Sequence, residues 1–168
     1  MRLTTMTDYA MRLLMYVGAH PERLCTISEV AQAYGISETH LMKITHQLGL
    51  RGWIETVRGK NGGMRLATAP ENISLGAVVR DIEHDLNLVE CFAPDNSCVL
   101  SGRCRLSAII GGALQRFLQH MDGYSLADIL LDDSTAPPLR RAQAPKRPVA
   151  VPQGKAAGAR KRASVKPG

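Results

Sequence analysis

Three cysteines in the second half of the chain have a spacing that points to metal chemistry. Cys91, Cys98 and Cys104 form the pattern C-x6-C-x5-C, and the residues between them are rich in proline, asparagine, serine and glycine. Such a composition is typical of a loop. A loop can turn several sulfur atoms toward one centre, and thiolates are ligands that soft transition metals prefer. The pattern therefore favours an iron–sulfur cluster held by these three cysteines.

Two alternatives stay open on the spacing alone. Structural zinc sites usually pair their ligands at C-x2–4-C and use four of them. Here the gaps are six and five. The nearest histidines are His84, before the first cysteine, and His120, after the last, and each is far along the chain from the cysteine at the other end. Inert buried cysteines are the second alternative, although a polar loop is poor core sequence, and the sequence has no redox C-x-x-C motif. The fourth cysteine, Cys25, stands apart and is expected to be a small buried hydrophobe.

Upstream of the cysteines, successive capping motifs predict a helix–turn–helix. A helix over residues 7–19, with Thr7 as its N-cap, comes first. A T-x-x-E capping box at residues 26–29 then opens a short helix, which Gly35 can end in the left-handed conformation. Ser37 is a strong N-cap for a second helix, which would enter the major groove of DNA. The positions of this second helix that face the core are Leu41, Ile44 and Leu48.

A hairpin with a basic tip follows the second helix. Residues 53–57 predict a strand and residues 64–66 its return, and Asn61-Gly62 is a strong hairpin signal because both residues tolerate positive φ. The combination predicts a winged helix, whose wing would follow the minor groove or the phosphates. An ordinary hairpin with a solvated charged turn is the alternative interpretation. The expected DNA contacts lie on the two helices and the wing: Ser28, Ser37, Thr39, His40, Lys43, Arg58, Lys60 and Asn61.

The second half of the chain is predicted to bind the cluster and to form a dimer. Ser74 caps a helix, the cysteine loop spans roughly residues 85–102, and a longer helix runs over residues 103–121. That helix is apolar over more than one face, and Gly111-Gly112 at its middle favours close approach of another helix. A last short helix begins with the S-x-x-D motif at Ser125. We therefore expect a mainly α fold with a small β-hairpin wing and a long dimerisation helix.

The distribution of charge divides the chain into three parts. Residues 134–168 hold nine Lys/Arg and no Asp or Glu, whereas the whole chain has a net charge of +6. Residues 1–66 are net basic and residues 67–133 net acidic, so the positive charge lies where DNA phosphates could use it. The expected organisation is a winged helix–turn–helix domain at 1–72, a cluster loop with dimerisation helices at 73–133, and a disordered basic tail at 134–168. Without a secretory signal or a membrane-length apolar stretch, the expected location is the cytoplasm, with no membrane contact.

Over residues 1–133 the sequence resembles the NsrR-type nitric-oxide-sensing repressors, which are related to the iron–sulfur regulator IscR. The resemblance implies a homodimer that binds a double-stranded DNA operator and carries one cluster, 2Fe–2S or 4Fe–4S, per subunit. The three cysteines match its ligands, and Asp8 matches a carboxylate ligand contributed by the other subunit. Read alone, Asp8 would be an acid favoured by the helix dipole. The matching segments are Leu3-Thr4, Thr7-Asp8-Tyr9, residues 27–48, residues 57–63, the triple cysteine and residues 124–128.

Two departures from the family pattern bear on the expected function. Ser107 stands where IscR-type proteins have a histidine, and the first cysteine gap is one residue longer than in some NsrR-type members. The expected function is a repressor, not an enzyme, in which nitric oxide attacks the cluster and relieves repression of nitric-oxide detoxification or denitrification genes. The alternatives are an iron–sulfur homeostasis regulator of the IscR type and a DNA-binding protein with zinc-based or thiol-based redox sensing.

Overall fold

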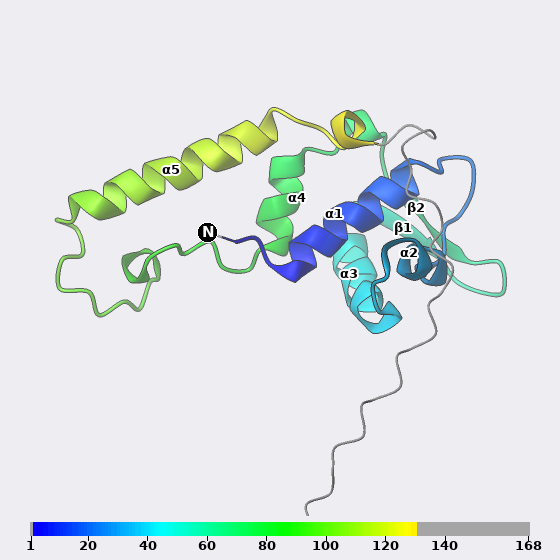
Figure 1. Ribbon diagram of the computed structural model, residues 1–168, viewed down its shortest axis with the longest axis horizontal. Helices are drawn as coiled ribbons and strands as arrows, with labels where there is room; N and C mark the ends of the chain where they lie inside the picture. Colours follow the sequence, from blue (N-terminus) through cyan, green and yellow to red (C-terminus); the bar gives the residue numbers. More distant parts are fainter. Residues whose placement is uncertain (1, 131–168) are drawn as a thin grey trace, which may run out of the picture.

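The computed structural model describes residues 2–130, and these form two regions joined by one short helix. Figure 1 shows a winged-helix half (residues 2–66) on one side and the long helix α5 extending away on the other, with α4 between them. The described helices and strands, in chain order, are α1 (Thr5–Gly18), α2 (Ile27–Tyr34), α3 (Glu38–Leu50), β1 (Ile54–Val57), β2 (Gly63–Leu66), η1 (Pro70–Asn72), α4 (Leu75–Ile82), η2 (Glu90–Phe92), α5 (Arg105–Asp122) and η3 (Ala127–Ile129). The mainly α fold with a hairpin wing is confirmed. No described helix is long and apolar enough to cross a membrane.

Helix α1 begins earlier than its sequence pattern predicts. Thr4 is the N-cap, and its side chain accepts a hydrogen bond from the backbone N–H of Thr7. The prediction of Thr7 as N-cap was wrong, because Thr7 lies one turn inside the helix and is fully buried. The predicted core face is correct, since the residues buried along the helix include Ala10, Leu13, Leu14 and Val17.

The helix–turn–helix forms as its capping residues predict. Both halves of the Thr26–Glu29 capping box are present, and Gly35 ends α2 with φ 66° in the left-handed region. Ser37 accepts a hydrogen bond from the backbone N–H of His40 and so caps α3. The apolar side chains of α3 that form its core face, Leu41, Ile44 and Leu48, are fully buried.

The wing is a two-stranded antiparallel hairpin, but its turn differs from the prediction. The register pairs Ile54 with Leu66 and Val57 with Gly63, which leaves residues 58–62 as a five-residue loop. Positive φ occurs at Gly59, at 112°, and not at Asn61. The chain reverses through a hydrogen bond from Gly62 N–H to the Gly59 carbonyl, so the strand register, rather than the Asn-Gly pair, sets the turn.

Cys25 extends the hairpin on its other side. Its backbone N–H and carbonyl exchange hydrogen bonds of 2.9 and 2.8 Å with Met64 of β2. The side chain is fully buried, as predicted for a small hydrophobe, and burial raises the pKa of its thiol. Cys25 is therefore part of the core of the winged-helix half.

Helix α5 packs on α4 but buries none of its own side chains in the single chain. Arg80 of α4 and Asp122 of α5 form a two-pronged ion pair, with both N–O distances 2.6 Å. Hydrogen bonds from this guanidinium hold the pKa of the Asp122 carboxyl below its ordinary value. Ser74 caps α4, and the predicted Ser125–Asp128 motif leads into η3. The predicted basic tail lies outside the described residues.

Candidate functional site

The predicted DNA-contacting residues of the two helices are exposed. Thr39, His40 and Lys43 lie on the solvent side of α3, opposite the buried core face of the same helix. The Ser37 hydroxyl shares a 3.1 Å hydrogen bond with His40 Nδ1. Among residues 2–130, no carboxylate forms an ion pair with Lys43, so its charge is available to a nucleic acid. Ser28, on α2, is also exposed.

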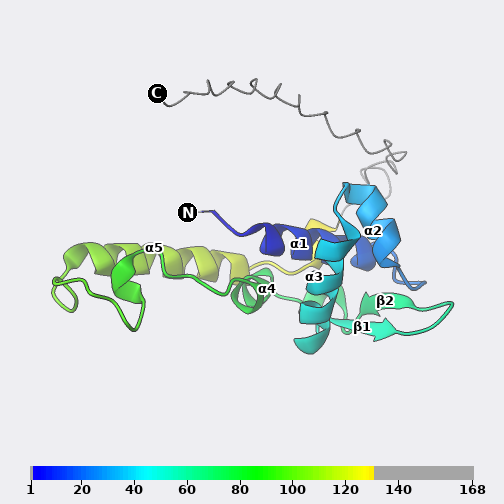
Figure 2. The ribbon, with the colours of Figure 1, turned by 90° about the horizontal axis from the view of Figure 1, so that it is seen from below.

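The wing tip carries the remaining predicted contacts. Arg58, Lys60 and Asn61 are all exposed in the five-residue turn. Figure 2 shows the hairpin extending beside α3 and away from α5. Residues of α3 and β1, together with Arg58 of the turn, line an open groove between the helix and the wing. The arrangement offers one helix and one basic loop to the same partner, as a winged helix does with DNA.

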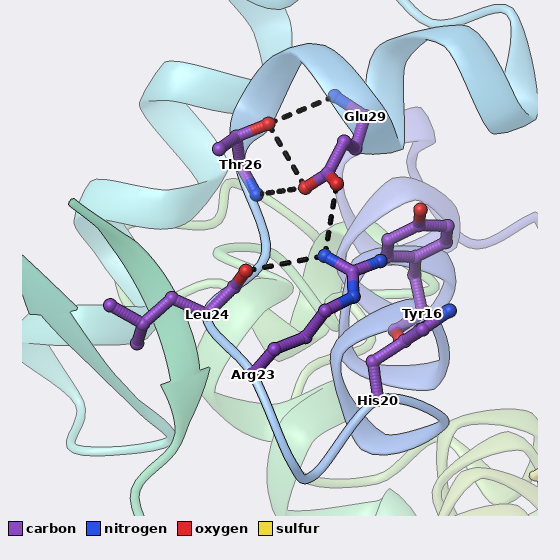
Figure 3. A network of polar contacts seen from close by, with 6 residues as sticks. All are labelled: Tyr16, His20, Arg23, Leu24, Thr26 and Glu29. Atoms are coloured by element: carbon purple, nitrogen blue, oxygen red, sulfur yellow. Dashed lines mark hydrogen bonds and ion pairs between the residues drawn. The ribbon is translucent and has the colours of Figure 1, made fainter. Parts of the chain in front are cut away.

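A polar network joins the start of α2 to the loop that precedes it (Figure 3). Arg23 donates to a Glu29 carboxylate oxygen at 2.9 Å and to the Leu24 carbonyl at 3.2 Å. The backbone N–H of Thr26 donates to the other Glu29 oxygen at 2.6 Å. Desolvation alone would raise the pKa of Glu29, but the hydrogen bonds from Thr26 and the charge of Arg23 outweigh it and lower that pKa. Glu29 is therefore ionised at neutral pH and ties the start of α2 to the loop before it.

The three predicted cluster ligands lie on the segment between α4 and α5. Cys91 lies in η2, Cys104 is the N-cap residue of α5, and Cys98 lies in the loop between them. All three are half-buried free thiols. In the described part of the chain, no three His, Cys, Asp or Glu side chains are gathered closely enough to hold a metal ion. The single chain therefore supplies the donor atoms but does not bring them together.

Asp8, the predicted fourth ligand, lies in the first turn of α1. Its carboxylate accepts hydrogen bonds from Arg12 one turn later, with an Nη2–Oδ2 distance of 2.9 Å and an Nε–Oδ1 distance of 3.1 Å. Its side chain is 50% exposed. The carboxylate faces solvent and is therefore open to contact from a second molecule.

Long-range polar contacts at the end of α4 are the feature that the sequence analysis missed. The Trp53 indole N–H donates to Asp81 Oδ2 at 2.9 Å, and Gln47 Nε2 donates to His84 Nε2 at 3.3 Å. The backbone N–H of Thr4 donates to the buried carboxylate of Glu83 at 2.6 Å. Each pair joins residues at least 28 positions apart, so no local sequence pattern marks it.

The fold and the exposed basic surfaces define a DNA-binding protein of the winged helix–turn–helix class. The sequence matches the Rrf2 family, described as iron-dependent transcriptional regulator, over residues 3–132. The chain belongs to the Rrf2 family. It is accordingly a transcriptional regulator and not an enzyme.

Curated relatives refine this assignment. The chain is 52% identical over 134 residues to the HTH-type transcriptional regulator NsrR of Geobacillus kaustophilus, covering 79% of this chain and 91% of that one. It is 46% identical over 135 residues to the regulator of the same name from Halalkalibacterium halodurans, covering 79% and 92%. These relatives confirm the resemblance to NsrR-type regulators.

The fold also matches solved structures at low sequence identity. The IscR structure from T. potens has a TM-score of 0.64 and 22% identity, and the match covers 86% of this chain and 94% of that chain. The structure of CymR, the global cysteine regulator of B. subtilis, has a TM-score of 0.60 and 23% identity, with 77% and 96% covered. At such identities the likeness establishes the winged-helix fold alone.

Proposed function

We propose that the chain is a cytoplasmic, homodimeric repressor that senses nitric oxide through an iron–sulfur cluster, either 2Fe–2S or 4Fe–4S, in each subunit. The observation that carries the proposal is the set of three free, half-buried thiols on one segment of a chain that is 52% identical to a regulator named NsrR. Release of the repressor from its operator would switch on nitric-oxide detoxification or denitrification genes.

The donor set suits an iron–sulfur cluster. Cys91, Cys98 and Cys104 are free of disulfides and belong to a segment that can rearrange, because its hydrogen bonds are local. When bound, the cluster supplies iron sites at which nitric oxide can react. The chain supplies three thiolates and, from Asp8 of the partner subunit, a hard carboxylate that would be the weakest ligand.

The dimer is proposed from the uncovered face of α5. Leu106 and Ile109 are 60% and 68% exposed. A Cβ added at Gly112 would meet no atom of the described chain within 4 Å. An amphipathic helix that leaves large aliphatic side chains in water is expected to bury them against another molecule. A second copy would cover this face and place two α3 helices in successive major grooves of a pseudo-palindromic operator.

Each predicted DNA contact has a physical role in this proposal. Lys43 of α3 would bind guanine or phosphate in the major groove, beside Thr39 and His40. The polar wing residues Arg58, Lys60 and Asn61 would follow the minor groove or the phosphate backbone. Ser37 and Ser28, near the starts of α3 and α2, would donate hydroxyl hydrogen bonds to phosphate.

An IscR-type role is less well supported than nitric-oxide sensing. Ser107 occupies the position at which IscR-type proteins have a histidine ligand. Its hydroxyl donates to the Cys104 carbonyl at 2.8 Å. The residue thus supports the start of α5, and a hydroxyl is a poor ligand for iron in a cluster.

Single replacement of each loop cysteine tests the cluster proposal. Each of three variants should lose the visible absorbance of anaerobically purified protein and its regulated operator binding: Cys91→Ala, Cys98→Ala and Cys104→Ala. The reason is that each change removes one of the three proposed thiolate ligands. Cys25→Ala is the matched control and should retain both. Full iron content in any of the three loop variants would contradict the ligand assignment. Mössbauer spectra of the wild type would distinguish 2Fe–2S from 4Fe–4S.

A further inference from the structure

The segment that carries the cysteines makes its hydrogen bonds almost entirely within itself. Between residues 85 and 103, the described bonds join neighbours such as Glu90 with Ser97 and Asn96 with Ser101. The long-range polar contacts of this part of the chain lie just before the segment, at the end of α4. A rearrangement of the segment would therefore affect the winged-helix half mainly through residues 81–84, which directly precede the segment.

His84 is one of these residues, and it contacts the recognition helix directly. Gln47 Nε2 of α3 donates to His84 Nε2 at 3.3 Å. The other amide atom, Gln47 Oε1, is buried and has no hydrogen-bond partner among the described residues. Gln47 lies one turn after Lys43 on α3. Loss of His84 would remove the one hydrogen bond that this amide makes among the described residues, beside a buried Oε1 that already has none, and this favours a shift of α3.

Asp81 lies one turn earlier on α4 and contacts the wing. Its Oδ2 accepts the 2.9 Å hydrogen bond from the Trp53 indole, and Trp53 directly precedes β1. Its Oδ1 lies 4.0 Å from Nη1 of Arg51, the C-cap residue of α3. One carboxylate thus holds the junction between the recognition helix and the wing. Figure 1 shows α4 between α5 and the winged-helix half, where these contacts place it.

We propose that His84 and Asp81 are positioning residues that transmit the state of the cysteine segment to α3 and to the wing. The inference rests on the proposed function, since it specifies how a change at the cluster alters DNA affinity. Two sites are coupled when both bias the same element between two arrangements. Here that element is the end of α4 with the two residues that follow it, where His84 contacts α3 and Asp81 contacts the residue before β1.

The first test measures coupling in the full-length, cluster-containing protein. Wild type should bind its operator more weakly after nitric oxide treatment, and His84→Ala should reduce the ratio of the two affinities at least about fivefold. His84→Gln, which keeps an acceptor for Gln47, should restore most of the ratio. His120→Ala is the matched control, because this histidine meets the ring of Tyr124 edge to face near the end of α5. A wild-type ratio in His84→Ala overturns the inference.

The second test separates the inference from the proposed function. In metal-free protein, alkylation of the loop thiols perturbs the segment without nitric oxide, while the buried Cys25 is protected. We expect faster amide hydrogen exchange in the second half of α3. A shifted emission maximum of Trp53, the chain's one tryptophan, should accompany it. Both effects should be lost in the His84→Ala, Asp81→Asn double variant. Unchanged exchange and emission in the wild type overturn the inference, whereas these effects without any nitric-oxide response overturn only the proposed function.

Discussion

Asp8 shows how one residue can serve either the fold or the function. It lies in the first turn of α1, where the helix dipole favours a negative charge, and it pairs with Arg12 four residues later. Both side chains are more than 40% exposed, so this ion pair contributes about 0–1 kcal/mol. A carboxylate worth so little to stability is free to be replaced, unless it has a second role across a dimer.

Replacement of Asp8 separates these roles. Asp8→Ala should lower the unfolding free energy by only about 0.3–1 kcal/mol. If Asp8 is the fourth ligand in the partner subunit, the variant should still assemble a cluster, with an altered absorbance spectrum and a blunted loss of operator binding during a nitric oxide titration. Arg12→Ala is the matched control, because it removes the same ion pair but keeps the carboxylate. Superimposable titrations of wild type and Asp8→Ala would leave Asp8 as a surface acid.

At the scale of the elements, local chemistry was predictable and register was not. The Thr26–Glu29 capping box, Gly35 and Ser37 act within one helical turn, so their roles follow from the sequence alone. The wing turn depends on which residues of β1 and β2 pair, and this pairing is set by packing of the whole hairpin. Thr4 and Thr7 offer the same hydroxyl one turn apart, so the sequence alone does not distinguish which of them caps α1.

The candidate site was predictable in its residue types and not in its connections. Three cysteines in a polar loop and exposed basic residues on α3 and the wing are visible in the sequence. The hydrogen bonds Gln47–His84 and Trp53–Asp81 join distant segments through ordinary residue types. Only the packing of α4 against the winged-helix half brings these partners together.

The capping box should make the fold sensitive to acid. The folded-state pKa of Glu29 lies below its ordinary value of 4.5. Its stabilising contribution is therefore fully present above pH 4.5 and is lost as the pH falls through the lower folded-state pKa. Glu29→Gln should unfold more easily than wild type at pH 7, and the two denaturation midpoints should converge below pH 4.5. Glu22→Gln, an exposed control, should match wild type at pH 7; a constant gap for Glu29→Gln at all pH values would contradict the assignment.

At the scale of the whole molecule, α5 leaves an apolar face exposed to solvent in the single chain. The face of α5 toward α4 is partly covered, whereas Leu106 and Ile109 point into solvent. The Arg80–Asp122 ion pair holds the helix at a fixed position relative to α4. A second α5 packed on the exposed face would therefore fix the distance between the two winged-helix halves.

A charge placed on this face should separate the subunits. Ile109→Glu should convert the dimer to monomer in analytical ultracentrifugation, because it would bury an unpaired carboxylate at an apolar interface. Operator affinity should fall with it, since the two α3 helices would then bind independently. Gln115→Glu adds the same charge on a different, exposed side of α5 and should remain dimeric. A dimeric Ile109→Glu variant would show that another surface joins the subunits.

The basic segment at residues 134–168 holds nine Lys/Arg and no Asp or Glu. It lies beyond residues 3–132, which match the family. Contacts between cations and DNA phosphates release counterions, so each adds to the slope of log affinity against log salt, by about 0.9 per phosphate. Truncation after Asp133 should keep operator preference, because the proposed base contacts come from α3 and the wing. It should weaken affinity for all sequences and flatten the salt slope. A full-length variant with these nine residues changed to Gln should behave like the truncation, since charge and not length is the cause. A wild-type slope in both proteins would show that the segment does not contact DNA.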